Sequence, residues 1–239
     1  MVLEYDGTAY HGWQEQPAGQ ATVAGEVRDA IARITGERPA LQAAGRTDAG
    51  AHSVGQTISF DLERELDTDR LRHSLNAVLP VDVAVREASV AEPGFHARFS
   101  ARRRTYRYLV ENRAERGALL RDRAWHVRQP LDIPAMRAAA AGLLGEHDLR
   151  AFGSDPAGRN TVRELSALRV RRLRNGLVAF DLTANAFLYG MVRRMVGFLV
   201  EVGLGRRSAG ESSELLRPGA VAAARVAPAR GLYQLAVEY

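Results

Sequence analysis

The stretch LQAAGRTDAGAHSVGQTISFD, residues 41–61, decides how the chain is interpreted. Residues 41–44 form a short run typical of a strand. Residues 54–61 place Val, Gln, Ile and Phe at every second position, the period of a half-buried strand. Between the two runs, residues 45–53 bring an acid, a base and two glycines together. We therefore expect the chemistry on this loop at the end of a sheet, with Asp48 as its acid.

Arg46 stands two residues before Asp48, so the two side chains can converge on a bent loop, and the guanidinium can contact a phosphate. The alternative is an ordinary hairpin, in which Thr47 and Asp48 make turn hydrogen bonds and Arg46 is solvated. His52 and Ser53 are neighbours on a predicted strand and point to opposite faces. They are therefore not expected to act as a base and a nucleophile.

Composition limits the classes of function. The 239 residues suffice for one large or two small domains. The chain has no Cys, which excludes disulfides and thiolate chemistry and is compatible with the cytoplasm. A strand is expected at residues 2–5 in place of a basic leader, and apolar runs stay below the ~20 residues of a membrane span, so we expect a soluble protein. All 33 basic residues are Arg against 28 acids, and the net charge of +5 favours a polyanionic partner.

Periodicity and turn signals predict an α+β fold with a mostly antiparallel sheet. Helices are expected at residues 22–36, 67–79, 132–145 and 188–202, and further strands at 81–90, 102–108, 162–173, 177–184 and 232–237. Asn175 and Gly176 predict a type I′ hairpin turn. A polar loop at residues 113–124 suggests two halves, 1–112 and 113–239.

Two aromatic and basic stretches allow alternatives. Tyr10 and Trp13 are expected to fill the edge of the core in preference to stacking on a base. The run from Arg102 to Tyr108 can be a solvated edge strand whose charges discourage pairing. It can also be a nucleic-acid face, in which guanidinium groups meet phosphates while a Tyr ring stacks on a base.

Four ordered motifs extend the argument beyond the loop. They are YDGTAYHGWQEQ at residues 5–16, GRTDAGAH at 45–52, FHARFSA at 95–101, and NAFL at 185–188 with MVR at 191–193. Together they resemble the TruA family of tRNA pseudouridine synthases, whose signature usually reads G-R-T-D-A-G-V-H-A. The resemblance implies a pseudouridine synthase fold with two similar halves around a basic cleft. It also implies an isomerase acting on uridines 38 to 40 of tRNA, as a cytoplasmic homodimer without a cofactor.

The resemblance also assigns roles to residues. It implies that Asp48 is the catalytic aspartate, that Arg46 helps displace and bind the target base, and that Arg193 pairs with Asp48. Tyr106 is expected to stack on the base, and Leu232 to belong to the substrate-binding set. Base flipping costs a few kcal/mol of unstacking, which Arg insertion and phosphate contacts would offset.

Some positions depart from the family pattern. Gly190 stands where the family often has His, Arg194 where it often has Asn, and Gln234 where it usually has Leu. If Gln234 lines the base pocket, an amide replaces an apolar wall. Arg193 also has an ordinary alternative, a surface Arg that pairs with Glu201 or with solvent.

The isomerisation that the resemblance implies requires one carboxylate and no metal or cofactor. The sequence has no metal-ligand cluster and no Gly-rich phosphate fingerprint, so neither a metal nor a cofactor is expected. No second acid is evident for a two-carboxylate glycosidase. The alternative function is a non-catalytic RNA-binding or chaperone protein on the same fold. Asp48, Arg46 and Tyr106 favour the enzyme, because a pure binder does not need an acid facing a polyanion.

Overall fold

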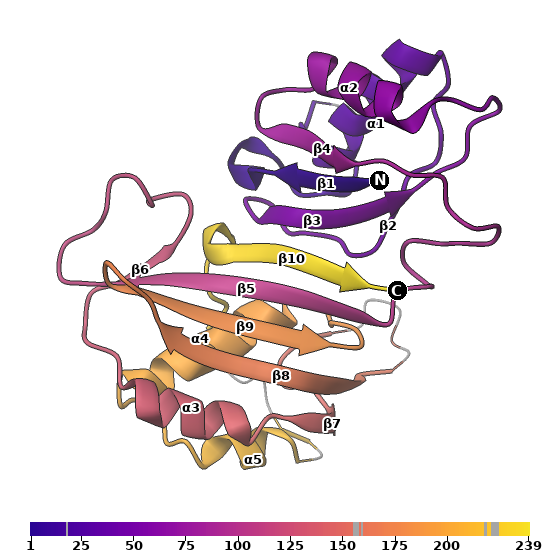
Figure 1. The fold of residues 1–239 in the computed structure, drawn as a ribbon. Helices are drawn as coiled ribbons and strands as arrows, with labels where there is room; N and C mark the ends of the chain where they lie inside the picture. Colours follow the sequence, from indigo (N-terminus) through magenta and orange to yellow (C-terminus); the bar gives the residue numbers. More distant parts are fainter. Residues whose placement is uncertain (18, 155–157, 159, 218, 221–224) are drawn as a thin grey trace. The chain divides into compact units, whose positions relative to one another are not determined.

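A computed structural model describes the chain as two compact units. It covers residues 1–239 except 18, 155–157, 159, 218 and 221–224. The first unit comprises Met1–Arg102 with Tyr233–Tyr239, and the second comprises Arg103–Leu232. Each unit contains its own strands and helices (Figure 1). Among the residues covered, no helix is both long and apolar enough to cross a membrane.

The first unit is built on the strand order β4-β1-β3-β10. Its elements are β1 (Val2–Tyr5), η1 (Gly7–Ala9), α1 (Val23–Thr35), β2 (Gln42–Ala43), β3 (His52–Ser59), α2 (Thr68–Val78), β4 (Val83–Glu87) and β10 (Leu232–Glu238). β1 is antiparallel to β3 and β4, and β2 is antiparallel to β3. The final strand runs parallel to β3, pairing Tyr233 with His52 and Gln234 with Ser53. This pairing brings the end of the chain beside the strand that follows the Asp48 loop.

Helices α1 and α2 lie side by side and bury their apolar stripes against β1, β3 and β4 (Figure 1). Thr22 caps α1 by accepting a hydrogen bond from the Gly25 N–H, and Asp67 caps α2 in the same way at Arg70. Pro80 follows α2, as expected for a helix stop. Both predicted helices are confirmed because their ends depend on local caps.

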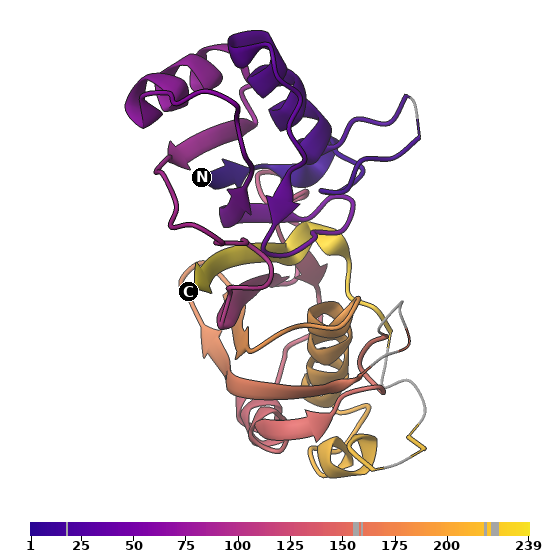
Figure 2. The same cartoon turned by 90° about the vertical axis from the view of Figure 1, so that its right-hand side faces the viewer.

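The second unit has the strand order β5-β9-β8-β7. Its elements are β5 (Arg103–Asn112), β6 (Trp125–Val127), α3 (Ile133–Ala141), β7 (Gly145–Asp148), β8 (Val162–Arg172), β9 (Leu177–Ala184), α4 (Met191–Gly203), α5 (Glu211–Leu215) and η2 (Ala229–Gly231). β6 pairs with β5 in parallel. α3 packs against α4 and β8, and α4 also contacts β5 (Figure 1 and Figure 2). Within each unit, the described strand pairs are antiparallel except β3 with β10 and β5 with β6, which confirms the predicted fold class.

Strand pairing explains where the expected elements were misplaced. The strand expected at 81–90 is only Val83–Glu87, because its partner β1 is four residues long. The helix expected to reach Gly145 ends at Ala141, since the chain must turn into β7, which pairs with β8. Leu144, within the range expected for that helix, is 41% exposed. The short elements β6, β7 and α5 were not predicted, because so few residues show no period.

The two units divide the chain differently from the expected halves. β5 pairs with β9 from Arg104 to Glu111, so the strand belongs entirely to the second unit. The last seven residues belong to the first unit because β10 pairs with β3. A strand is assigned by its neighbours in the sheet, whereas the polar loop after it marks only a change in composition. The halves 1–112 and 113–239 stay a prediction about domains.

Candidate active site

Asp48 lies on the loop between β2 and β3. Its side chain is half-buried, whereas the side chain of Arg46 is exposed. Thr47 between them is only 6% exposed, and its hydroxyl lies 2.8 Å from the Tyr5 hydroxyl on β1. The hairpin alternative treats Thr47 as a turn residue, but this hydrogen bond ties it to the core of the first unit. The loop is therefore anchored between the residues that carry its charges.

The backbone of this loop is fastened to the segment that follows β1. The Thr47 carbonyl accepts a hydrogen bond from the Trp13 N–H at 3.1 Å, and the Gly50 N–H donates to the Tyr10 carbonyl at 3.2 Å. Gly12 packs against the same backbone with φ of +91°, and an added Cβ would lie 2.7 Å from the Thr47 carbonyl oxygen. Glycine is required there both by the conformation and by the close approach. Two hydrogen bonds and one tight contact thus position the acid.

Tyr10 and Trp13 belong to the core of the first unit, as expected. Their exposed fractions are 6% and 3%, and the Tyr10 hydroxyl donates to Asp82 Oδ1 at 2.6 Å. Burial, together with the Asp82 carboxylate, raises the pKa of Tyr10 above its usual value. Both rings serve the scaffold of the loop.

His52 and Ser53 begin β3 and form separate contacts. The His52 Nδ1 atom lies 3.1 Å from the Gly7 N–H and 3.0 Å from Asp6 Oδ1, and its ring stacks on Tyr233 at 4.7 Å. The Ser53 hydroxyl donates to the Gln234 carbonyl at 3.2 Å. These different partners agree with the expectation that the two residues do not act as a base and a nucleophile.

In the second unit, Tyr106 and Tyr108 lie on one face of β5, with exposed fractions of 7% and 0%. The Tyr106 ring packs edge-on against Phe187, with centroids 4.8 Å apart. The Tyr108 hydroxyl donates to the Pro228 carbonyl at 2.6 Å. Burial raises the pKa of Tyr108 even though the Arg193 guanidinium acts in the opposite direction. Tyr108 is thus held as a core residue.

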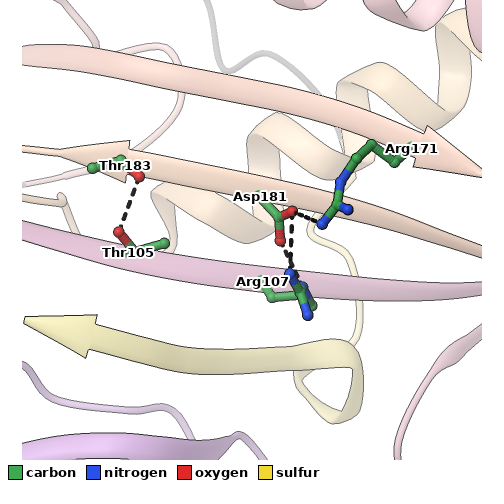
Figure 3. Close-up of polar contacts among 5 residues, drawn as sticks. All are labelled: Thr105, Arg107, Arg171, Asp181 and Thr183. Atoms are coloured by element: carbon green, nitrogen blue, oxygen red, sulfur yellow. Dashed lines mark hydrogen bonds and ion pairs between the residues drawn. The ribbon is translucent and has the colours of Figure 1, made fainter.

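The other face of this sheet carries a polar network (Figure 3). Arg107 donates to both carboxylate oxygens of Asp181, at 2.6 and 3.3 Å, and Arg171 donates to the same carboxylate. The hydroxyls of Thr105 and Thr183 lie 3.0 Å apart on the same two strands, β5 and β9. Burial alone would raise the pKa of Asp181, but the two guanidinium groups hold it below its ordinary value.

The alternation of β5 distributes the side chains of the basic run between the two faces of the sheet. Arg107 shares a face with Thr105, whereas Tyr106 shares its face with Arg104. Arg104 is only 9% exposed and donates to the Asn185 carbonyl at 2.8 Å. Arg102 and Arg103 are the exposed members of the basic run.

The second unit also carries Arg193 and Leu232. Arg193 stands in the first turn of α4, and its Nε atom donates to the Ala227 carbonyl at 2.7 Å, while the Ala227 N–H donates back to the Arg193 carbonyl at 3.1 Å. Glu201, the partner proposed in the ordinary alternative, lies 3.8 Å from Arg207. Leu232 is 6% exposed at the start of β10. Arg193 is thus fixed to the segment that precedes η2.

The departures from the family pattern have structural explanations. An added Cβ at Gly190 would lie 2.3 Å from the Arg194 Nη1 atom, which itself donates to the Tyr189 carbonyl at 3.1 Å. The Arg194 side chain therefore occupies the space that a side chain at position 190 would need. Gln234 is wholly buried and its amide donates to Gln56 Oε1 at 3.1 Å.

The geometry offers a single acid on an anchored loop. Across the described ranges of the chain, no group of three or more His, Asp and Glu side chains could hold a metal ion. Sequence reasoning missed one polar pair beside the loop, formed by Gln56 and Gln234. The signal was a Gln in the inward register of an otherwise apolar strand, but its partner lies 178 residues away.

Comparisons with known proteins agree with the motifs. The family model described as tRNA pseudouridine synthase matches residues 1–100 and 139–239. The chain is 45% identical to the tRNA pseudouridine synthase A of Moorella thermoacetica, over 100% of this chain and 98% of the relative. It is 39% identical to the protein of the same name from Acetivibrio thermocellus, with the same coverage. A solved structure titled as an H/ACA RNP bound to a substrate RNA containing 2'-deoxyuridine has a TM-score of 0.41 at 12% identity, covering 98% of this chain and 46% of the other.

Proposed function

The chain belongs to the tRNA pseudouridine synthase family as an isomerase that converts uridine to pseudouridine in tRNA, and we propose that Asp48 is its catalytic carboxylate. The observation that carries the proposal is the anchoring of the Asp48 loop. Thr47 and Gly50, on either side of the acid, are both hydrogen-bonded to the segment after β1. A catalytic group needs such a rigid support, because small displacements cost large factors in rate.

The reaction suits a site with one acid. The bond from the sugar carbon C1′ to N1 breaks, the uracil turns, and a new bond forms from C1′ to C5. The C5 proton is lost and N1 gains a proton, so substrate and product have the same atoms. A single carboxylate beside the sugar, with a pocket that stabilises the detached uracil and excludes water, is sufficient for this chemistry.

The remaining roles are part of the same proposal. Tyr106 stacks on the target base, Leu232 contacts it, and Arg46 helps to displace it from the RNA stack. Arg193 pairs with the carboxylate of Asp48. Tyr106 is preferred to Tyr108 for stacking because it matches the position of the ring in the family motif.

The proposed substrate site and assembly follow the family resemblance. We propose that uridines 38 to 40 of the tRNA anticodon arm are modified, and that the enzyme works in the cytoplasm as a homodimer bridged by one tRNA. The net charge of +5 supports binding to a polyanion. Mapping pseudouridine along treated tRNA tests the positions, and sedimentation at assay concentration tests the dimer. A monomer with full activity would exclude the bridging arrangement.

The decisive experiment compares Asp48→Asn with wild type. The change preserves size but removes the charge, so conversion should disappear while the fold and tRNA binding persist. Release of tritium from uridine C5 of labelled tRNA measures conversion, because that position loses its hydrogen. Asp61→Asn is the matched control, since Asp61 is an exposed acid just after β3. Appreciable turnover by Asp48→Asn would contradict the assignment, and a wild-type protein that binds tRNA without conversion would favour the RNA-chaperone alternative.

A further inference from the structure

Two buried side-chain amides, one on β3 and one on β10, form successive hydrogen bonds that end at the catalytic loop. The Gln56 side chain on β3 donates from Nε2 to the Gly45 carbonyl at 2.6 Å. The Gln234 side chain on β10 donates from Nε2 to Gln56 Oε1 at 3.1 Å. Both Gln residues are 0% exposed, so the hydrogen bond between the two amides is shielded from water, whereas Gly45 is half-buried.

The orientation of both amides follows from one fixed group. The Gly45 carbonyl can only accept, so Gln56 must turn its NH₂ toward it. The Gln56 Oε1 atom then needs a donor, and the NH₂ of Gln234 supplies it. Among the described residues, the Gln234 Oε1 atom is left buried without a hydrogen-bond partner.

Gly45 lies where the chain leaves the pairing of β2 with β3 and enters the loop that carries Asp48. The ladder between β2 and β3 ends where the Ala44 N–H donates to the Thr57 carbonyl at 2.9 Å. Gln56 therefore continues the pairing by one residue with a side chain, at the point where the chain leaves the sheet toward Asp48. The Thr47 carbonyl is held by the Trp13 N–H, and the Gly50 N–H after the acid donates to the Tyr10 carbonyl. Asp48 thus follows directly on a short segment, residues 45–47, that is fixed on both sides of Arg46.

We propose that Gln56 is a positioning residue that holds the Gly45 carbonyl and thereby aims Asp48, and that Gln234 orients the Gln56 amide. The inference rests on the proposed function, because Asp48 is the group that is aimed. It also gives a role to the amide at position 234, where the family pattern usually has Leu. Neither residue touches the substrate in this proposal.

The test uses Gln56→Leu, Gln234→Leu and the double variant. Gln56→Leu should lower kcat for tRNA by about ten- to a hundredfold, as expected when a catalytic group shifts by up to an ångström, with tRNA affinity unchanged. Gln234→Leu should lower kcat by a smaller factor. The double variant removes both amides and leaves only the Gly45 carbonyl unpaired. It should therefore recover part of the stability that Gln56→Leu loses while kcat stays low.

Two further measurements separate positioning from ordinary stability. Val27→Ala, in the buried face of α1, should lower the unfolding temperature without changing kcat well below that temperature. Hydrogen exchange of residues 44–51 should accelerate in Gln56→Leu but not in Val27→Ala. If Gln56→Leu fails to fold, Gln234→Leu and the double variant supply the same comparison.

Three results would overturn the proposal. One is wild-type kcat in Gln56→Leu, another is unchanged exchange of the loop, and the third is recovery of kcat together with stability in the double variant. Asp48→Asn separates this inference from the assignment of the acid. An inactive Asp48→Asn beside a fully active Gln56→Leu refutes only the positioning role, whereas an active Asp48→Asn refutes the catalytic assignment on which that role rests.

Discussion

Replacing Gly12 by Ala should displace the catalytic loop although residue 12 carries no reactive group. The backbone there has φ of +91°, and an added Cβ would lie 2.7 Å from the Thr47 carbonyl oxygen and 3.2 Å from Ala49 N and Asp48 C. A left-handed conformation costs about 1–2 kcal/mol for a residue with a side chain. Overpacking against the loop backbone costs about 1–3 kcal/mol more. We therefore expect Gly12→Ala to lose about 2–5 kcal/mol of unfolding free energy.

The loop must move to relieve this clash, because the contacts are with its backbone and not with a flexible side chain. A displacement near 1 Å at a catalytic group can cost about a hundredfold in rate. Gly36→Ala is the matched control. Gly36 has φ of +83° at the end of α1, and beyond its neighbours along the chain no heavy atom lies within 4 Å of an added Cβ. Gly36→Ala should therefore lose only the free energy of the left-handed conformation, about 1–2 kcal/mol, and should keep the wild-type kcat.

Urea unfolding and pseudouridine formation, measured on both variants at a temperature where each is folded, test the argument. The reasoning fails if Gly12→Ala loses no more stability than Gly36→Ala and converts tRNA at the wild-type rate. It also fails if Gly36→Ala loses activity to the same extent, because backbone strain alone would then account for the effect.

Three further predictions concern salt, pH and metal ions. Affinity for tRNA should fall steeply between low and high salt, because Arg–phosphate contacts release counterions, and a flat dependence would contradict binding through basic residues. Asp181→Asn should cost about 1–3 kcal/mol at pH 7 by removing charged hydrogen bonds to Arg107 and Arg171. Because the folded pKa of Asp181 is lowered, that contribution is present above pH ~4 and is lost as pH falls through the folded pKa. The wild type and Asp181→Asn should therefore converge in urea unfolding at low pH. Conversion of a small stem-loop should survive a chelator, and a strict need for a transition metal would refute the one-acid site.

The sequence predicted what depends on neighbouring residues. The helix expected at residues 22–36 is α1, Val23–Thr35, and Asn175 and Gly176 both have positive φ, 57° and 73°, as a type I′ turn requires. The loop that carries Asp48 was found because an acid and glycines between two strand patterns are visible in one window. Such features need no knowledge of the rest of the fold.

What the sequence did not predict depends on pairings between distant strands. The bond from Gln234 to Gln56 spans 178 residues and exists because β10 runs parallel to β3. The extent of β4 depends on the length of β1, and the end of α3 depends on where β7 begins. The role of Gly12 was also hidden, because a glycine in a loop gives no sign of the backbone that it approaches.

The hydrogen bonds that hold the loop involve neutral groups, so the position of Asp48 and the binding of tRNA should respond differently to salt. Trp13 N–H, the Tyr5 hydroxyl, the Tyr10 carbonyl and the Gln56 amide are all neutral hydrogen-bonding groups. Salt screens interactions between charges but acts weakly on buried hydrogen bonds between neutral groups. Changes in salt should therefore act on tRNA binding while leaving the aim of Asp48 intact. It follows that kcat at saturating tRNA should be nearly independent of salt even where affinity changes by orders of magnitude.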